Sequence, residues 1–353
     1  MSKRTSIVVG IDVGDEWSHV YAQEFATGEV LHDGRVQTEP RALRGLFGRW
    51  KGARVALEVG THSPWMQELL EGLGHEVLVA NARKLRCIFA STNKQDHLDA
   101  RVLAKVARMD PSLLYPIRHR RRETREDLAV LRARTHLVRM RAEAVQVVRG
   151  MVKSHGGRVP ACETEAFARR AREHLPAGLV AALEPVLEVI EDLSRRIEAY
   201  DEAVETMARE KYPEVQALTQ VTGVGTLTAL CFVLTLEDPA RFRRSREVGP
   251  ALGLVPRRDQ SGETDRHLPI TKTGDEYLRS LLVESAQCIL RRASKPSDLK
   301  DWGRKLASRG GKAGKRRAVV AVARKLAVLL HRLWVTQAAY ERYRAGKVHR
   351  TAA

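Results

Sequence analysis

The sequence predicts an α/β domain in the first third of the chain, a long helical hairpin in the middle and a mostly α-helical domain in the last third. Three observations support this interpretation. Short apolar runs typical of strands alternate with helical patterns at the start. Two long stretches of helical period follow, and the remainder is helical apart from one polar segment. We therefore expect three domains, over residues 1–112, 113–211 and 212–353.

The elements of the first domain can be assigned from periodicity and from turn residues. In chain order they are strands at 6–13, 18–25 and 28–37, a helix at 39–50, a strand at 54–60, a helix at 63–74 closed by Gly74, a strand at 76–81 and a helix within 93–109. An antiparallel meander followed by βαβ units is the layout of an RNase H-like sheet. The same pattern also fits other mixed α/β domains.

The middle of the chain combines a basic linker with two long helices. Two prolines and a basic cluster mark residues 109–123 as a linker that crosses a phosphate surface, through Arg118, Arg120, Arg121 and Arg122. Apolar residues then recur every three or four positions over 124–155 and again over 181–211, with a broken connection between them. The pattern predicts a coiled-coil hairpin, packed within one chain or between copies.

The charge of the chain indicates a polyanionic partner. The formal net charge is +18, and residues 295–353 hold 16 Lys or Arg against three acids, which gives this tail a charge of +13. Nucleic acid fits better than a membrane surface, because no apolar face rich in Trp or Phe accompanies the basic residues. Aromatic residues are only 5% of the chain, so we expect stacking of bases on aromatic side chains to contribute little to sequence recognition.

Other bulk features favour a cytoplasmic protein. The start, "MSKRTSIVVGIDVG", enters a strand without a secretory apolar region, and no run of 18 apolar residues occurs. The four cysteines lack any CxxC spacing. We therefore expect reduced, mostly buried thiols, and no zinc site, disulfide or membrane partner.

Four carboxylates fall where they could meet at one edge of the predicted sheet. Asp12 is the only charge in "IVVGIDVG", Glu58 follows the apolar run of "RVALEVG", and Asp96 and Asp99 share one helix face. Carboxylates this close raise one another's pKa values unless cations neutralise them. Two Mg²⁺ ions would do so and would promote attack on a phosphodiester.

A structural interpretation of each acid remains open. Asp12 would cap a turn, Glu58 would pair with an Arg, and Asp96 would cap the helix. For a single acid this interpretation is preferred, since structural ion pairs outnumber sites. The joint pattern on a matching strand order favours the metal site.

The C-terminal part carries three further candidates. The stretch "TGVGTLTA", residues 222–229, resembles a phosphate-holding helix-hairpin-helix turn, although a tight helix–helix connection explains it equally well. Ser261 lies in a polar loop predicted over 256–274, as a nucleophile among cations or as part of a surface turn. Phosphate contacts are expected from basic residues of this loop and of the tail, namely Arg257, Arg258, Arg266, Lys272, Lys312, Lys315, Arg316 and Arg317.

The chain resembles the insertion sequence 110 family of transposases, in family order and over nearly its full length. The matching stretches are "GIDVG", "LEVG", "KQDHLDARVLA", "LTQVTGVGTLTA", "DPARFRRSREVGPALGLVPRRDQSG" and "ITKTGDEYLRSLLVESA". In the last of these, the family pattern commonly has a double Ala where this chain has "VESA", with Glu284.

The resemblance implies a RuvC-like N-terminal domain with a D-E-D-D set and a C-terminal transposase domain. It further implies that Asp12, Glu58, Asp96 and Asp99 bind Mg²⁺ and that Ser261 joins covalently to DNA. It also implies a homo-oligomer, dimer or tetramer, in which acids of one subunit meet the serine of another. The partners would be double-stranded DNA of the element ends and target, and a structured guide RNA encoded by the element.

Two other functions remain as alternatives. A metal-dependent junction nuclease would use water as the nucleophile, with Ser261 only shaping a turn. A nucleic-acid-binding scaffold would have no catalytic activity at all.

Overall fold

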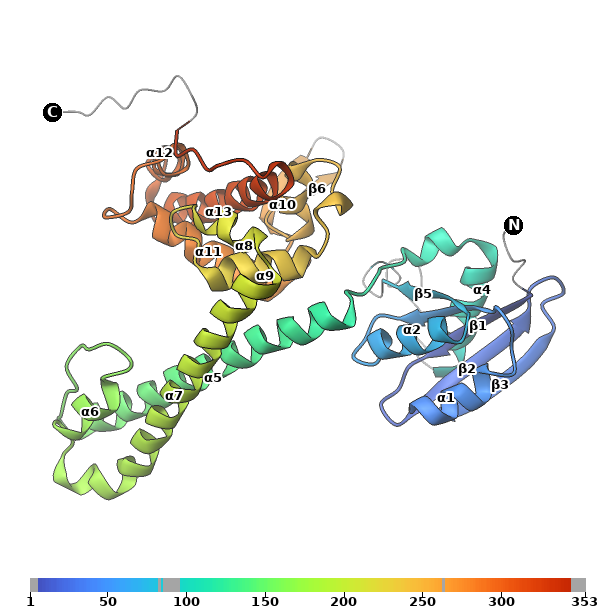
Figure 1. Ribbon diagram of the computed structural model, residues 1–353, viewed down its shortest axis with the longest axis horizontal. Coiled ribbons are helices and arrows are strands. Elements are labelled where there is room, and N and C mark those ends of the chain that lie inside the picture. Colours follow the sequence, from blue (N-terminus) through green and yellow to red (C-terminus); the bar gives the residue numbers. More distant parts are fainter. Residues whose placement is uncertain (1–5, 82–83, 85–95, 262–263, 344–353) are drawn as a thin grey trace. The chain divides into compact units, whose positions relative to one another are not determined.

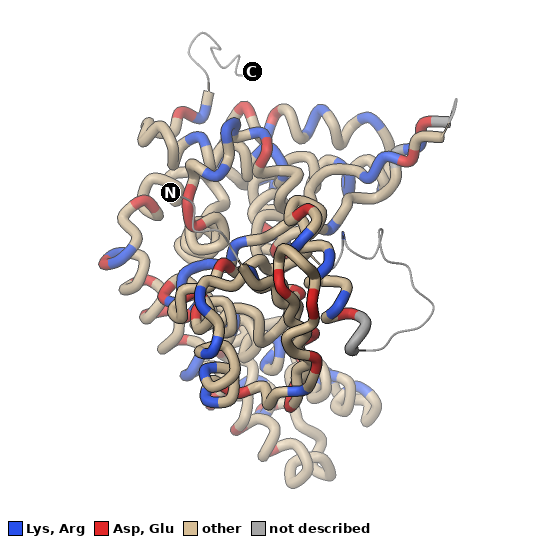
Figure 2. The backbone as a smooth tube through the Cα atoms, turned by 90° about the vertical axis from the view of Figure 1, so that its right-hand side faces the viewer, with Lys and Arg blue, Asp and Glu red and all other residues tan. Residues whose placement is uncertain are grey.

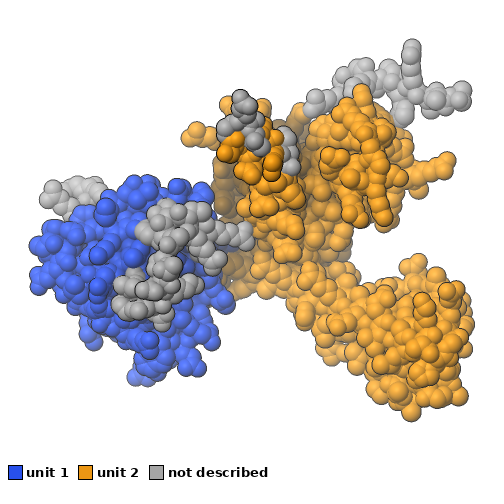
Figure 3. All heavy atoms as spheres, turned by 180° about the vertical axis from the view of Figure 1, so that it is seen from behind, with its two compact units in different colours: residues 1–120 blue, residues 121–353 orange. Residues whose placement is uncertain are grey.

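The chain folds into two compact units, residues 1–120 and 121–353 (Figure 3). The computed structural model describes residues 6–81, 84, 96–261 and 264–343. The division into three domains stays a prediction, and the long helices fall within the second unit.

A five-stranded mixed sheet forms the centre of the first unit (Figure 1). Its strands are β1 (Ile7–Asp12), β2 (Trp17–Glu24), β3 (Val30–Gln37), β4 (Arg54–Glu58) and β5 (Glu76–Ala80). Their order across the sheet is β3-β2-β1-β4-β5. The first three strands are antiparallel, whereas β4 runs parallel to both β1 and β5. The predicted meander followed by parallel crossovers is thereby confirmed.

Helices cover both faces of this sheet. On one face α1 (Pro40–Phe47) and α2 (Ser63–Gly72) bury Phe47 and Met66 against Ile11 of β1. On the other face α4 (Asp96–Met109) packs against Val8 and Ala56. Because side chains alternate along a strand, odd-numbered residues of β1 face α1 and α2, and even-numbered ones face α4.

The end of α2 follows the glycine signal in the sequence. Gly74 has a φ of +87°, a backbone conformation that favours glycine. Its N–H donates to the carbonyl of Glu71 at 2.9 Å, and the N–H of His75 donates to the carbonyl of Leu70 at 3.1 Å. These two bonds are those of a Schellman motif, so Gly74 closes the helix as predicted.

The stretch read as a linker is packed against the sheet through its first half. A short 3₁₀ helix, η1 (Pro111–Leu114), buries Leu114 completely. Ile117 then forms a bridge with Val79 of β5, where its N–H donates to the carbonyl of Val79 at 2.9 Å. Only the residues after this bridge connect the two units.

The second unit is mostly helical, as the sequence predicts. Its elements are α5 (Arg122–Ser154), α6 (Phe167–Arg172), η2 (Ala177–Leu179), α7 (Val180–Lys211), α8 (Glu214–Thr219), α9 (Thr226–Leu236), η3 (Pro239–Arg241), η4 (Ser245–Glu247), α10 (Val248–Ala251), β6 (Pro256–Ser261), β7 (Thr264–Ile270), α11 (Glu276–Leu290), α12 (Asp298–Ala307) and α13 (Gly311–Thr336). Its core gathers around α9, which is buried from Thr228 to Leu236.

The long helices α5 and α7 pack as an antiparallel pair. Val152 near the end of α5 packs with Leu183 near the start of α7, whereas Leu131 and Val204 share the core at the opposite ends. This confirms the two predicted long helices and their antiparallel arrangement. Packing of the knobs-into-holes kind, which defines a coiled coil, stays a prediction.

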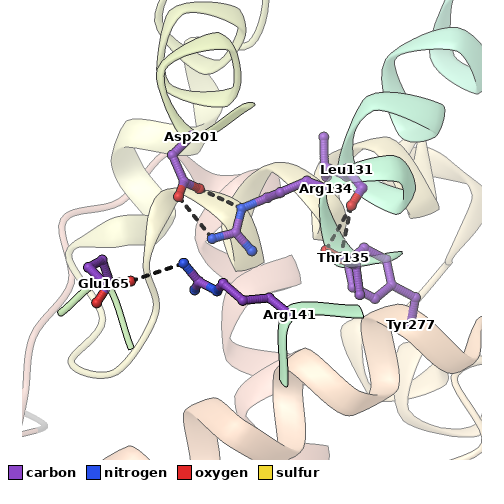
Figure 4. A network of polar contacts seen from close by, with 7 residues as sticks. All are labelled: Leu131, Arg134, Thr135, Arg141, Glu165, Asp201 and Tyr277. Carbon is purple, nitrogen blue, oxygen red and sulfur yellow. Dashed lines mark hydrogen bonds and ion pairs between the residues drawn. The ribbon is translucent and has the colours of Figure 1, made fainter. Parts of the chain in front are cut away.

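Between the two apolar clusters, polar contacts join the two helices beside the buried Leu193 and Ile197 of α7. Arg134 forms a two-bond ion pair with Asp201, and Nη1 of the buried Arg141 lies 3.4 Å from Glu165 (Figure 4). The same Nη1 donates to Ser194 at 3.1 Å. A charge buried at this depth needs such partners. The bonds therefore fix the register of α5 against α7.

Candidate active site

Asp12 and Glu58 lie at the same edge and on the same face of the sheet. The parallel register pairs Ile11 with Leu57, so the two acids are the next residues of neighbouring strands. Alternation places both on the face covered by α4, the same face as Val8 and Ala56. Asp12 is half-buried and Glu58 is exposed, and both make contacts in the structure.

Helix α4 runs antiparallel to β4 and begins at the edge that carries these acids. Near its end, the carbonyl of Ala107 accepts a hydrogen bond at 3.2 Å from Arg54, the first residue of β4. Its first turn, with Asp96 and Asp99, must therefore lie toward the other end of the strand, where Glu58 is. Asp99 is exposed, whereas the side chain of Asp96 lies outside the described residues.

The chemistry of this set fits a hard divalent cation. All four candidate ligands are carboxylates, which Mg²⁺ prefers, and no cysteine lies among them. Among the residues whose side chains are described, no three His, Cys, Asp or Glu lie close enough together to hold a metal ion. The structure thus brings three of the predicted acids to one edge without assembling them into a site.

A charged network that the sequence did not predict borders Asp12. His19, which pairs with Asp12 across β1 and β2, donates to Asp33 of β3 at 2.6 Å. Arg101 of α4 donates to the same carboxylate at 2.9 Å. The bond from His19, with that from Arg101, holds the pKa of Asp33 below its usual value. No sequence pattern links these residues, because they come from three separate elements.

A second unpredicted contact ties the end of the basic linker to the turn after Glu58. Ser63 is fully buried, its Oγ accepts from the N–H of Gly60 at 3.0 Å, and its hydroxyl donates to the carbonyl of Gly60 at 2.8 Å. Its one proton is then used, so His119 Nε2, at 2.8 Å, must donate to Oγ. Arg118 and Arg120, which flank His119, are thereby held near this edge.

The predicted serine loop is wrong in its local structure. Residues 256–261 and 264–270 form the two strands of an antiparallel hairpin, β6 and β7. Every residue of β6 is exposed, so no apolar alternation was present to reveal a strand. Ser261 is the last residue of β6, and the following Gly262 lies outside the described residues.

The base of the hairpin is anchored to the helical core. Arg279 of α11 is buried and donates to the carbonyls of Thr273 at 2.8 Å and Leu252 at 3.2 Å. Gly253 and Gly274 have φ values of +66° and +74°, and a Cβ on either would overlap neighbouring backbone atoms. Among the described residues, those of β6 are exposed and Leu268 and Ile270 of β7 are half-buried, and the hairpin is anchored where it leaves the core.

The first residues of α11 also hold this region to α5. Asp275 caps α11 by accepting from the N–H of Leu278 at 2.9 Å, and its other oxygen pairs with Arg132 at 3.2 Å. The hydroxyl of Thr135 bonds that of Tyr277 at 2.6 Å (Figure 4). Glu284, which departs from the family pattern, is exposed on the same helix.

The glycine turn between α8 and α9 is a packing feature. A Cβ on Gly223 would lie 3.0 Å from the carbonyl oxygen of Ser285 and 3.1 Å from Ile289, so glycine permits close packing on α11. At the start of α9, Thr226 donates to Glu205 at 3.0 Å. A carboxylate thus lies where the phosphate interpretation requires an anion, which favours the tight helix–helix connection.

Most of the basic residues proposed from the sequence are exposed, Arg120 is half-buried, and two of the exposed ones form ion pairs. Lys and Arg are spread over both units (Figure 2). Exposed ones are Arg118, Arg122, Arg257, Arg266, Lys272, Lys312, Lys315, Arg316 and Arg317. Arg121 pairs with Glu237 at 3.3 Å and Arg258 pairs with Asp265 at 2.8 Å. None of the helices in the described ranges has the length and apolar character needed to cross a bilayer.

Two family models match the chain. A model of DEDD transposases matches residues 9–156, which include Asp12, Glu58, Asp96 and Asp99. A model described as the transposase IS116/IS110/IS902 family matches residues 215–302, which include Ser261.

Curated relatives match most of the chain. It is 31% identical over 360 residues to the transposase for insertion sequence element IS1111A of Coxiella burnetii, covering 96% of this chain and 92% of that protein. It is 28% identical over 308 residues to the transposase for insertion sequence element IS1328 of Yersinia enterocolitica, covering 84% and 87%. A probable family 20 transposase of Pseudomonas aeruginosa is 28% identical over 299 residues, covering 82% and 86%.

Proposed function

The chain belongs to the IS116/IS110/IS902 family of transposases, and on that premise we propose that it recombines DNA through a covalent bond to Ser261. Its DEDD transposase domain implies a RuvC-like fold for the first unit and a divalent metal. The position of Ser261 supports the finer chemistry. Ser261 is the last residue of an exposed strand, in a hairpin that Arg279 anchors at its base. A substrate as wide as duplex DNA can therefore reach the serine hydroxyl.

We propose that Asp12, Glu58, Asp96 and Asp99 hold the metal, as Mg²⁺ and in two ions. One observation supports this metal site most: Asp12 and Glu58 lie at the same edge and on the same face of the sheet, next to the start of α4. When bound, Mg²⁺ would neutralise phosphate charge and the repulsion between the carboxylates. The four acids would hold the ions at this edge of the sheet, and the ions would attract the phosphate to the same edge.

The proposed reaction exchanges one ester bond for another. The Oγ of Ser261 forms a bond to phosphorus while the bond from phosphorus to one sugar oxygen breaks. The serine proton passes to a base, and the released sugar oxygen takes up a proton. The bond energy is retained in the serine phosphodiester, so a second sugar hydroxyl can reverse the step on another strand.

The proposed partners follow from charge and from the family. A net charge of +18 suits a polyanion, and double-stranded DNA of element ends and target is the substrate of the proposed reaction. We propose in addition a guide RNA encoded by the element, and a dimer or tetramer. Omission of that RNA from a recombination assay tests the first, and light scattering tests the second.

Covalent capture tests the proposed nucleophile. The full chain is incubated with labelled element-end DNA, the proposed guide RNA and Mg²⁺, denatured and separated by gel electrophoresis. We expect a protein–DNA adduct that Ser261→Ala abolishes and that the exposed control Ser308→Ala retains. Recombination by Ser261→Ala would overturn the proposal.

The same assay separates the alternatives. A junction nuclease would cleave DNA without an adduct, and Ser261→Ala would still cleave. For a scaffold, Asp12→Asn would leave every measured activity unchanged. Under our proposal Asp12→Asn retains DNA binding and loses cleavage, because only the metal site is changed.

A further inference from the structure

We propose that Arg266 stabilises the negative charge that develops on the phosphate attacked by Ser261, and that Arg258 has a structural role within the hairpin. This assignment rests on the proposed function, because it presupposes attack by Ser261. The sequence offers three arginines beside the serine and no means to rank them. The register of the hairpin supplies the ranking.

Alternation along the strands places Arg266 on the face of Ser261. The register pairs Ser261 with Thr264 and Asp259 with Arg266. Asp259 and Ser261 are two residues apart on β6, so they share one face, and the residue directly opposite Asp259 shares it too. Arg266 is therefore the diagonal cross-strand neighbour of Ser261, at a spacing of about 7–8 Å that a long side chain spans.

Arg258 lies on the opposite face, and its guanidinium is already bound. Its Nε donates to one carboxylate oxygen of Asp265 at 2.9 Å and its Nη2 to the other at 2.8 Å. Asp265 pairs in register with Gln260, which is on the face away from Ser261. The ion pair thus agrees with the faces that alternation assigns. Because it neutralises the charge of Arg258, we do not assign this residue the phosphate contact that was expected from the sequence.

The remaining charged residues do not compete for this role. The register of the hairpin shifts between Pro256 and Arg258, so alternation assigns no face to Arg257. Asp259 lies directly opposite Arg266. Within the described part of the chain, however, no ion pair holds the guanidinium of Arg266, and this side chain is exposed. Arg266 thus remains available for an incoming phosphate.

The chemistry of guanidinium suits this position. During attack the phosphate gains negative charge on its non-bridging oxygens, and the planar guanidinium can donate two parallel hydrogen bonds to them. A donor aimed at developing charge typically changes the rate of the step by about 10²- to 10³-fold. Lysine supplies the positive charge but not the two parallel N–H donors, so Arg266→Lys would restore the rate only in part.

Matched variants on the two faces test the assignment. The rate of adduct formation is measured in single turnover in the covalent-capture reaction with element-end DNA, and DNA affinity is measured by fluorescence anisotropy. The variants are Arg266→Ala, Arg266→Lys and a charge-balanced double variant that combines Arg258→Gln with Asp265→Asn. We expect Arg266→Ala to slow adduct formation by about 10²-fold or more, with DNA affinity changed much less. Arg266→Lys should fall between it and the unaltered protein, and the double variant should stay within a few-fold of the unaltered protein.

The outcomes separate the two proposals. If the unaltered protein forms an adduct and Arg266→Ala forms it equally fast, or if the double variant is slowed as much, the assignment is wrong and the proposed function stands. If Arg266→Ala weakens DNA binding in proportion to the rate, Arg266 only binds substrate and the assignment is again wrong. If the unaltered protein forms no adduct, both proposals fail.

Discussion

Gly10 of β1 lies in direct backbone contact with Ala100 of α4. A Cβ at Gly10 would overlap the carbonyl oxygen of Ala100 and approach the backbone N of Ala104 to 2.7 Å. This contact lies between Asp12, two residues further along the strand, and Asp99, next to Ala100 on the helix. The absence of a side chain at Gly10 therefore sets how close the two halves of the acid set come.

Gly10→Ala should displace α4 and weaken binding at the proposed metal site. The new methyl group meets backbone, which cannot rotate away, so we expect a loss of about 2 kcal/mol or more in the free energy of unfolding. Mg²⁺ binding measured by calorimetry should weaken as well. Gly72→Ala in α2, where a Cβ meets nothing within 4 Å, is the matched control. It should leave Mg²⁺ binding unchanged and should not lower the free energy of unfolding, because alanine is favoured over glycine in a helix. Equal effects of the two substitutions would contradict this account.

Ser63→Ala should destabilise the turn that follows β4. The substitution removes the buried hydroxyl that accepts from the Gly60 N–H and from His119. We expect the free energy of unfolding to fall by about 1–3 kcal/mol. Urea unfolding of Ser63→Ala, His119→Ala and the double variant measures the coupling between the two side chains. We expect the double variant to be more stable than the sum of the single effects predicts, and strict additivity would show that the bond is not formed in solution.

The first unit should lose stability as the pH falls below 7. Burial lowers the pKa of His75, and burial likewise lowers the pKa of His32, so the folded chain protonates both rings at a lower pH than the unfolded chain does. The unfolded chain protonates them near pH 6.5, and the stability that is complete above that pH then declines as protons favour the unfolded state. Urea unfolding at pH 7.5 and 5.5 should show a smaller decline for His75→Gln. An unchanged decline would assign the effect to other groups.

Arg279→Ala should loosen the base of the serine hairpin. The substitution removes two charge-assisted hydrogen bonds to carbonyl groups that remain buried. We expect this to lower the free energy of unfolding by about 2–3 kcal/mol. Amide exchange of Thr271 and Lys272, whose N–H groups bond to Val255 and Gly253, should accelerate. Arg266→Ala, on the exposed part of the same hairpin, should leave these rates unchanged. If both variants exchange alike, Arg279 is not the anchor.

Several elements could be predicted because their signals are local. The end of α2 follows from Gly74, which takes the left-handed conformation that closes a helix. The buried strand β1 and the two long helices follow from the spacing of apolar residues, which is a property of one element at a time. Strand β6, which ends at Ser261, gave no such signal, because every one of its residues is exposed and no alternation of apolar and polar residues marks it.

The sequence by itself determined the family, the residue types of the acid set and the placing of Asp12 and Glu58 at the ends of two apolar runs. Only the tertiary structure decided that these two acids share a face, that His119 binds Ser63, and that Arg266 rather than Arg258 shares the face of Ser261. The reason is physical. Apolar periodicity is a property of neighbours along the chain. Register, strand order and polar pairing instead join residues of different elements, such as Ser63 and His119, which are 56 positions apart, and the chain leaves their separation free until it folds.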